Sequence, residues 1–398
     1  MTGPAEGGGG PAAPAGPAGP GQTGGSGQSD GPGQPAATAG RERYVAYVTK
    51  GLADVVTGEL AALVPGLEIA AASERFVIIA AGPAELAMLL ARGRTFDDIR
   101  LLAAGPAPVP DAARFAGLCA QAAAVTRAYL AGHDDPRAAA VPWSVTMSAR
   151  QPPWRAQGWD PAPVIADQLG GADLHGTERR DVDLRIQADG ELMHISASLT
   201  ARPHGKREPG VARPGALRPG VAAALVRLAV QAAAPGAARR GLYDPCCGTG
   251  TVAAEAARLG LPVYASDLDP EAVSLTAARL AALGTQARQP RPARPPRVFQ
   301  QDVLRAVPRD IGAVIVASNL PWGKQIRLPR EGELFDAVAA LLAPRLAGGG
   351  ACALLTTSGD RLAARIRRRA PGAQLSTRRI GLLGQTPAIV VAGPPAAR

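Results

Sequence analysis

In the second half of the chain, short apolar runs alternate with amphipathic helical stretches, and few folds accommodate that alternation. The apolar runs are residues 242–244, 263–267, 297–300, 313–318 and 351–356. Helical patterns at 250–259, 270–283 and 331–346 separate several of them. Because strands spaced by helices form a parallel sheet, the sequence predicts a doubly wound α/β domain whose ligand site lies outside the carboxyl ends of the strands.

A glycine-rich turn follows the first of these runs. The segment Tyr243-Asp-Pro-Cys-Cys-Gly-Thr-Gly-Thr251 closes a strand and opens a helix. Gly248 and Gly250 let the backbone turn tightly and approach a ligand with no Cβ in the way. A dinucleotide fingerprint, G-x-G-x-x-G, needs a third glycine where this chain has Ala253. Taken alone, the turn fits either a ligand-binding loop or a purely structural turn.

Carboxylates stand at the ends of three successive runs. Asp244 ends the first, Asp267 ends the second, and Asp302 follows the third. A carboxylate at the second strand end can accept both hydroxyls of a ribose, in dinucleotides and other nucleosides alike. Asp302 is placed to accept a hydrogen bond from an adenine amino group. The three positions together indicate a site for a nucleoside-containing cofactor.

The segment Ser318-Asn-Leu-Pro-Trp-Gly-Lys324 follows a very apolar run. An exocyclic base amine is a poor nucleophile because its lone pair is delocalised into the ring, so catalysis needs acceptors for its N–H groups. The Asn319 side-chain oxygen and the Leu320 carbonyl, on a backbone stiffened by Pro321, would supply two. Trp322 offers a stacking face for the base. The alternative is an Asn-x-Pro turn with a packing tryptophan.

These residues resemble the amino-methylating class of S-adenosylmethionine-dependent methyltransferases, whose motif is Asn or Asp, an apolar residue, Pro and an aromatic residue. Asp244-Pro-Cys-Cys-Gly-Thr-Gly-Thr251 with Asn319-Leu-Pro-Trp-Gly-Lys324 is similar to the THUMP-domain tRNA guanine-N2 methyltransferases, which form N2-methylguanosine in the acceptor stem. The resemblance implies a Rossmann-like class I methyltransferase domain preceded by α+β ferredoxin-like and THUMP domains. It also implies S-adenosylmethionine as cofactor, direct in-line methyl transfer without a metal, and tRNA bound by its acceptor stem and 3′ end.

The resemblance assigns roles to individual residues. Asn319, Leu320, Pro321 and Trp322 are expected at the reacting base. The expected cofactor-binding set is Asp244, Pro245, Cys246, Gly248, Gly250, Thr251, Asp267, Asp302 and Asn319. Contacts to RNA are expected from Arg202, Lys206, Arg207, Arg213, Arg218 and Lys324. We interpret Cys246 and Cys247 as small packing residues.

The first half predicts two small α+β units. Strand patterns at 44–48, 67–72, 76–80 and 99–103, with helical patterns at 52–64 and 83–92, have the order of a ferredoxin-like unit. A proline-rich linker is expected at 105–110. Helices at 112–130 and 161–169, a strand at 142–147 and a hairpin of 181–187 with 191–199 follow it.

The domain boundaries follow from these patterns. Residues 1–40 contain 21 Gly or Pro and no Leu, Ile, Val or Phe, so they are expected to be a disordered tail. A ferredoxin-like domain is expected at 41–108, a THUMP-like RNA-binding domain at 109–204, a basic linker at 205–218 and the methyltransferase domain at 219–398. The segment 51–60 is similar to an amino-terminal Gly-Leu-Glu helix of the family, although Ala53 replaces the glutamate.

Composition narrows the class of protein. The formal charge of +10 favours an anionic partner, although arginine supplies all but three of the 43 basic residues, as a GC-rich genome would also produce. Four cysteines without a C-x-x-C pair argue against a zinc ribbon or a disulfide scaffold. The longest apolar stretch, 221–234, contains Arg227 and is too short to span a membrane. A cytoplasmic protein is expected.

Four alternatives remain open on the sequence. An rRNA guanine-N2 methyltransferase, a DNA amino-methyltransferase that extrudes its base and a protein-glutamine N5-methyltransferase all share the Asn-x-Pro-aromatic chemistry. The last two would leave the THUMP-like half unexplained. A non-catalytic RNA-binding module would have no reason to retain Asp244, Asp267 and Asn319.

Overall fold

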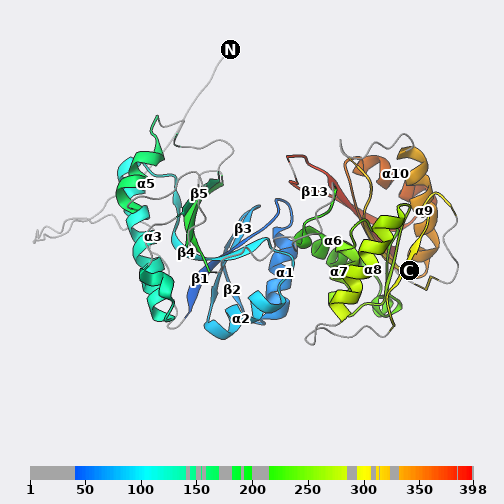
Figure 1. Ribbon diagram of the computed structural model, residues 1–398. Helices are drawn as coiled ribbons and strands as arrows, with labels where there is room; N and C mark the ends of the chain where they lie inside the picture. Colours follow the sequence, from blue (N-terminus) through cyan, green and yellow to red (C-terminus); the bar gives the residue numbers. More distant parts are fainter. Residues whose placement is uncertain are drawn as a thin grey trace, which may run out of the picture. The chain divides into compact units, whose positions relative to one another are not determined.

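The computed structural model describes most of the chain from residue 41 onward. The described residues are 41–139, 144–148, 154, 158–169, 182–189, 192–199, 215–284, 294–305, 311–312, 314–322, 331–382 and 384–396. Residues 40–398 form one compact unit. It contains two seven-stranded sheets, one in each half of the sequence (Figure 1). The expected tail and most of the expected basic linker lie outside the described residues.

The first elements have the ferredoxin-like order. They are β1 (Glu42–Tyr47), α1 (Ala53–Leu63), β2 (Glu68–Ala72), β3 (Phe76–Ala81), α2 (Pro83–Arg92) and β4 (Asp98–Pro108). The strands lie in the order β2-β3-β1-β4, and each neighbouring pair is antiparallel. Helix α2 begins at a proline, and the Glu85 carboxylate accepts a hydrogen bond of 2.8 Å from the Gly82 N–H, which caps its first turn. The expected β-α-β-β-α-β pattern is confirmed.

The next elements extend the same sheet. They are α3 (Ala112–Gly132), the short helix η1 (Pro136–Ala139), β5 (Ser144–Ser148), α5 (Pro161–Leu169), β6 (Asp183–Asp189) and β7 (Leu192–Ser198). Strand β7 pairs antiparallel with both β4 and β6, and β5 pairs parallel with β6. The two small units expected from the sequence therefore share one sheet.

The prediction of a linker at 105–110 is wrong for residues 105–108, because β4 continues to Pro108. Ala107 lies opposite Met193, and Pro108 lies opposite Leu192. The register shifts twice along this pairing, once between Leu102 and Ala104 and again between Ala104 and Ala107. Prolines cannot donate to a sheet, and such irregular pairings are where strands tolerate them.

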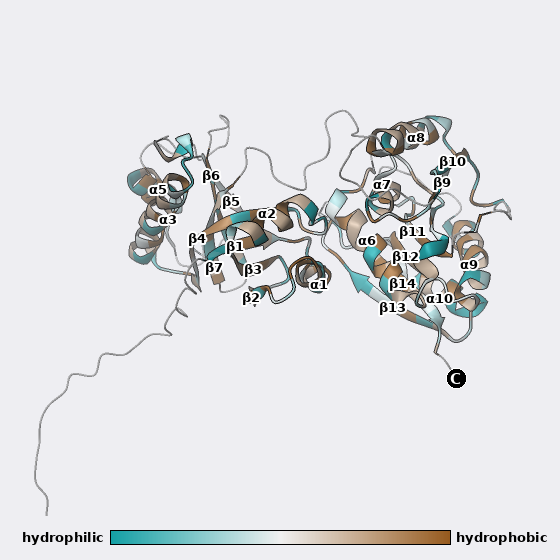
Figure 2. Cartoon of the chain, turned by 90° about the horizontal axis from the view of Figure 1, so that it is seen from below, coloured by the Kyte–Doolittle hydropathy of each residue, from teal (hydrophilic) through white to brown (hydrophobic). Residues whose placement is uncertain are grey.

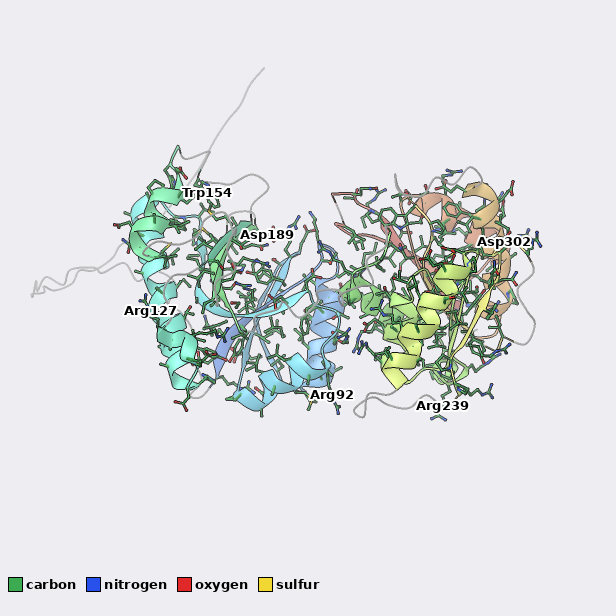
Figure 3. All side chains as sticks on the ribbon, viewed as in Figure 1. Arg92, Arg127, Trp154, Asp189, Arg239 and Asp302 are labelled. Carbon is green, nitrogen blue, oxygen red and sulfur yellow. The ribbon has the colours of Figure 1, made fainter. Side chains whose placement is uncertain are left out.

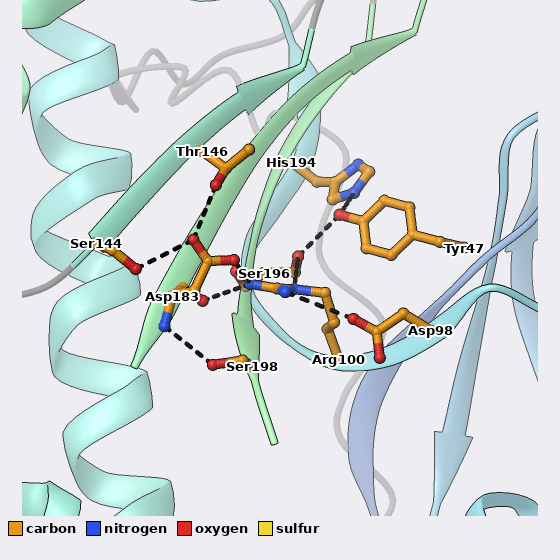
Figure 4. Close-up of polar contacts among 9 residues, drawn as sticks. All are labelled: Tyr47, Asp98, Arg100, Ser144, Thr146, Asp183, His194, Ser196 and Ser198. Atoms are coloured by element: carbon orange, nitrogen blue, oxygen red, sulfur yellow. Dashed lines mark hydrogen bonds and ion pairs between the residues drawn. The ribbon is translucent and has the colours of Figure 1, made fainter. Parts of the chain in front are cut away.

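A buried polar network crosses the junction between β4, β6 and β7 (Figure 4). The Arg100 side chain is 2% exposed and lies 3.5 Å from the Asp98 carboxylate and 2.8 Å from the Asp183 carboxylate. Its Nε donates to Ser196 Oγ at 3.2 Å. Ser196 Oγ also lies 2.8 Å from the Tyr47 hydroxyl, so the network joins strands from both expected units.

The second half forms the predicted α/β domain. Its elements are α6 (Pro219–Ala232), η2 (Ala237–Arg240), β8 (Leu242–Asp244), α7 (Thr251–Arg258), β9 (Val263–Asp267), α8 (Pro270–Gly284), β10 (Arg297–Gln300), β11 (Ile315–Asn319), α9 (Glu331–Ala347), β12 (Ala351–Thr356), α10 (Gly359–Arg369), β13 (Ala373–Arg379) and β14 (Ala388–Pro395). The strand order is β10-β9-β8-β11-β12-β14-β13. Strands β10, β9, β8, β11 and β12 are parallel, whereas β14 is antiparallel to both neighbours. The expected parallel sheet is thus a mixed one.

Helices cover both faces of this sheet. Apolar residues of α6, α7 and α8 share one buried cluster, and those of α9 and α10 share another. The helix ribbons carry both hydrophilic and hydrophobic residues, as amphipathic elements do (Figure 2). None of the helices in the described part of the chain is long and apolar enough to cross a membrane.

Helix α1 contributes to the core of the second half as well. Leu52 and Val55 belong to the same apolar cluster as Val221 of α6. The fully buried Glu59 carboxylate accepts a hydrogen bond of 2.6 Å from Arg227 of α6. Apolar packing and an ion pair with a buried carboxylate thus connect the first half of the chain to the second.

Candidate active site

Four of the predicted site residues lie at one edge of the second sheet. Asp244, Asp267 and Asn319 are the last residues of β8, β9 and β11, which are neighbouring parallel strands. Asp302 follows β10, and the N–H of the preceding Gln301 donates to the Asp267 carbonyl at 2.9 Å. Figure 3 labels Asp302, which lies beyond the carboxyl end of β10, and Arg239, which lies before the amino end of β8. The strand order reverses between β8 and β11, where open α/β sheets bind their ligands.

The glycine-rich loop between β8 and α7 is held from two sides. The N–H of Gly248 donates to the Asp267 carboxylate at 2.8 Å. From α8, the Thr276 hydroxyl donates to the Gly248 carbonyl at 3.0 Å, and Arg279 donates to the Thr249 carbonyl at 3.3 Å. Both loop glycines have positive φ, +53° at Gly248 and +74° at Gly250. The loop therefore has a defined shape, with Pro245 and Thr251 buried and Cys246 half-buried.

We expect Gly250→Ala to perturb this loop more than Gly248→Ala does. Positive φ costs any residue with a Cβ about 1–2 kcal/mol, and both variants carry that cost. A Cβ at Gly250 would also lie 2.9 Å from the Thr276 side chain, whereas a Cβ at Gly248 meets nothing within 4 Å. Thermal unfolding of the two variants measures the difference. Equal destabilisation would show that the Thr276 contact does not shape the loop.

Asp244 is a buried carboxyl group. It is 1% exposed, and its Oδ1 accepts hydrogen bonds from the Ser318 hydroxyl at 2.6 Å and from the Cys246 N–H at 3.3 Å. Burial raises the pKa of Asp244 to about 7, against the opposing effect of these two donors. The folded chain thus holds a proton here that the unfolded chain, with an aspartate pKa of about 3.9, has lost at neutral pH.

This pKa predicts a pH-dependent stability. Between about pH 4 and pH 7 the folded chain binds one proton more than the unfolded chain, so this group's contribution to stability is lost as the pH rises through that range. Asp244→Asn removes the charge that forms above pH 7. We expect the cofactor-free variant to unfold at a higher temperature than the unaltered protein at pH 8, and to exceed it by a smaller margin at pH 5. A temperature difference that is the same at both pH values would contradict the account.

The two cysteines of the loop are poor nucleophiles. Burial raises the pKa of Cys246 and that of Cys247 above the usual thiol range, and the Asp244 charge acts in the same direction. Both thiols are therefore protonated at neutral pH, and the thiol is far less reactive than the thiolate. Among the described residues, no group of His, Cys, Asp and Glu is arranged to hold a metal ion.

The Asn319 side chain has two partners of opposite polarity. Its Oδ1 accepts a hydrogen bond of 2.7 Å from the Trp322 indole N–H, and its Nδ2 donates to the Gly215 carbonyl at 3.1 Å. Leu320 is fully buried, and its N–H donates to the Leu355 carbonyl of β12 at 3.1 Å. The backbone that would present the Leu320 carbonyl is thus fixed to the sheet.

Of the six residues predicted to contact RNA, Arg218 lies in the described part of the chain. Arg202, Lys206, Arg207, Arg213 and Lys324 lie outside the described residues. Arg218 directly precedes α6, is half-exposed and lies 3.7 Å from the Asp97 carboxylate. Its charge is therefore partly balanced by the protein itself.

Three residues that support the site were missed by the sequence analysis. Ser318 donates to Asp244, Thr276 holds the glycine-rich loop, and Gly215 accepts from Asn319. Trp322 was expected only as a stacking face, whereas its N–H also donates to Asn319. Ser318 immediately precedes the expected motif, and this adjacency was the one signal available.

The second sheet is Rossmann-like and includes the antiparallel strand β14. A glycine-rich loop follows its first strand and a polar motif follows its fourth, and these features together define a class I methyltransferase fold. The comparisons agree, since residues 206–385 match the family model described as RMKL-like, methyltransferase domain. This region is thus similar to the methyltransferase domains that the family model describes.

One curated relative is a tRNA (guanine(6)-N2)-methyltransferase of Thermus thermophilus. It is 35% identical over 222 residues, which make up 51% of this chain and 60% of the relative. The match therefore covers less than two thirds of the relative's length.

Two solved structures share the fold over most of both chains. TrmN from Thermus thermophilus superposes with a TM-score of 0.60 and 24% identity, covering 88% of this chain and 99% of its own. A putative methyltransferase complexed with SAH superposes with a TM-score of 0.61 and 15% identity, covering 91% of this chain and 100% of its own. The expected α/β fold of the class I methyltransferase type is confirmed.

Proposed function

We propose that this chain is an S-adenosylmethionine-dependent tRNA methyltransferase of the cytoplasm that methylates the exocyclic N2 amine of a guanosine. The observation that carries the proposal is the oriented Asn319 amide, at the end of β11 and beside the glycine-rich loop. The curated relative supports tRNA as the substrate and guanine N2 as the acceptor. Its name places the methylated guanine at position 6, which lies in the acceptor stem, and we propose the same region here.

The cofactor-binding residues fit S-adenosylmethionine. Gly248, where a Cβ would meet nothing within 4 Å, leaves room for a close ligand, and Asp267 offers carboxylate oxygens to the ribose hydroxyls. Asp302 would accept from the adenine amino group. Asp244 would face the cationic methionine part, whose charge would favour the ionised carboxylate. The backbone of Pro245, Cys246 and Thr251 would line the same loop. The bound cofactor supplies an electrophilic methyl group on its sulfonium.

The reaction needs positioning more than acid–base chemistry. The Asn319 Oδ1 and the Leu320 carbonyl accept the two N–H groups of the guanine amine, and this removes its lone pair from conjugation with the ring. The bound cofactor would offer its methyl group in line with the amine nitrogen, S-adenosylhomocysteine would be the leaving group, and the proton released by the nitrogen would pass to water. Pro321 would stiffen the turn, and the Trp322 ring would limit the position of the base.

The first half of the chain would bind the tRNA. We propose a ferredoxin-like domain at 41–108 and a THUMP-like domain at 109–204, which would contact the 3′ end. The basic linker 205–218, with Arg202, Lys206, Arg207, Arg213, Arg218 and Lys324, would contact phosphates. If so, the logarithm of affinity falls by about 0.7–0.9 per phosphate contact for each tenfold rise in salt.

Methyl transfer to unmodified tRNA tests the proposal. The purified chain is incubated with tRNA transcripts and S-adenosylmethionine carrying a labelled methyl, and the nucleosides are analysed by mass spectrometry. We expect label in N2-methylguanosine, and no label when the acceptor-stem guanosine is replaced by adenosine. Cofactor binding without label in any tRNA nucleoside would overturn the proposal and favour an rRNA or a protein-glutamine acceptor.

A further inference from the structure

The Asn319 side chain contacts one group that can only donate a hydrogen bond and one that can only accept. An indole N–H only donates, and a backbone carbonyl only accepts. Trp322 therefore requires the Asn319 oxygen on its side, and Gly215 requires the amide nitrogen on the other side. The two distances, 2.7 Å and 3.1 Å, are those of ordinary hydrogen bonds. Both contacts demand the same orientation of the amide.

Gly215 belongs to a distant part of the sequence. It lies three residues before Arg218, the residue at the N-terminus of α6, and its φ of +81° is one that residues with a Cβ rarely adopt. Leu217, two residues further on, is buried in the apolar cluster of the second half. The left-handed backbone conformation of Gly215 and the burial of Leu217 thus fix the position of the Gly215 carbonyl.

We propose that Gly215 and Trp322 are positioning residues that fix the Asn319 amide, and that the Gly215 carbonyl excludes a carboxylate from position 319. This inference rests on the proposed function, in which the Asn319 oxygen accepts from the guanine amine. Without the Gly215 contact the amide could turn over and present its N–H₂ group to the base. A donor there would repel the amine that it has to bind.

A carboxylate at position 319 would have no hydrogen to donate to Gly215. Only the protonated carboxylic acid, with one O–H and one carbonyl, matches the polarity of the amide. Among the described residues, the ionisable groups on the adjoining strand ends and the loop are Asp244 on β8, Cys246 and Cys247 in the loop after it, and Asp267 on β9. On the other side, β12 presents Leu355 opposite Asn319. Above about pH 7, where Asp244 is ionised, its charge also favours the protonated acid.

Thermal unfolding of the cofactor-free chain tests the contact without any substrate. The carboxyl group that Asn319→Asp introduces must be protonated to donate a hydrogen bond to the Gly215 carbonyl. The folded variant therefore binds this proton more tightly than the unfolded variant does. We expect its unfolding temperature to fall further below that of the unaltered protein at pH 8 than at pH 5. Asn319→Ala should show the same deficit at both pH values. An Asn319→Asp deficit that does not change with pH overturns the proposal.

Turnover of two glycine variants tests the positioning role. Gly215→Ala strains the backbone that carries the carbonyl. Gly236→Ala is the matched variant, because Gly236 has the same φ of +81° and a Cβ added there would meet nothing within 4 Å. We expect at least a tenfold loss of kcat for Gly215→Ala with S-adenosylmethionine affinity retained, and less than a twofold loss for Gly236→Ala. Equal losses overturn the proposal. If the unaltered chain methylates no tRNA, the proposed function fails, while the unfolding comparison still decides the contact.

Discussion

Asn319→Ala is expected to lower methyl transfer sharply while leaving tRNA bound. The substitution removes an acceptor for the guanine amine, and the loss of one preorganised polar group at a reacting centre lowers kcat by about 100- to 1000-fold. The loop that would hold the cofactor is fixed by Asp267, Thr276 and Arg279 and does not depend on the amide. Single-turnover kinetics with saturating tRNA, together with the dissociation constants of both ligands, measure the effect.

Ser274→Ala is the matched control for this variant. Ser274 is exposed on α8, and its hydroxyl donates only to the Pro270 carbonyl one turn earlier, at 3.0 Å. We expect this variant to keep the kcat of the unaltered protein. Unaffected turnover of the Asn319→Ala variant would show that Asn319 takes no part in the reaction and would contradict the assignment of the motif.

Arg100→Ala is expected to cause the largest loss of stability. Arg100 is 2% exposed and neutralises Asp98 and Asp183, whose side chains are 8% and 25% exposed (Figure 4). Removing one partner of a buried ion pair leaves uncompensated charge and costs about 3–5 kcal/mol. Because the network joins β4 to β6 and β7, the loss should appear in the unfolding of the first sheet. Denaturant unfolding measures it.

Arg379→Ala provides the comparison for this variant. Arg379 is 69% exposed and lies 3.4 Å from Asp360, which is 81% exposed. Ion pairs in water contribute about 0–1 kcal/mol, so this variant should unfold almost like the unaltered protein. A similar loss for both variants would show that burial of the Arg100 network contributes nothing.

The sequence predicted the elements with strong periodicity. Helices α2 and α5 and strand β9 begin and end where the residue pattern places them. Proline at the first turn of each helix and a polar residue at the end of the strand mark these boundaries locally. The edge where Asp244, Asp267 and Asn319 meet could also be predicted, because parallel strands end together.

Long-range contacts could not be predicted in the same way. Arg100 resembles a surface residue in sequence, and its burial depends on Asp183 and Ser196, which lie far along the chain. Gly215 follows a proline- and arginine-rich stretch typical of a linker, and its partner Asn319 is 104 residues away. Strand β4 continues through a proline-rich segment because β7 supplies an irregular partner. In each case the deciding partner comes from a different element.

Replacement of the target guanosine by inosine tests the central claim most directly. Inosine lacks only the 2-amino group, so a tRNA carrying it at the methylated position keeps the shape and charge of the substrate. The account predicts that this tRNA binds as the guanosine tRNA does and receives no methyl group. Methylation of the inosine tRNA at the same rate would contradict the account, because the methyl group would then go to an atom other than N2.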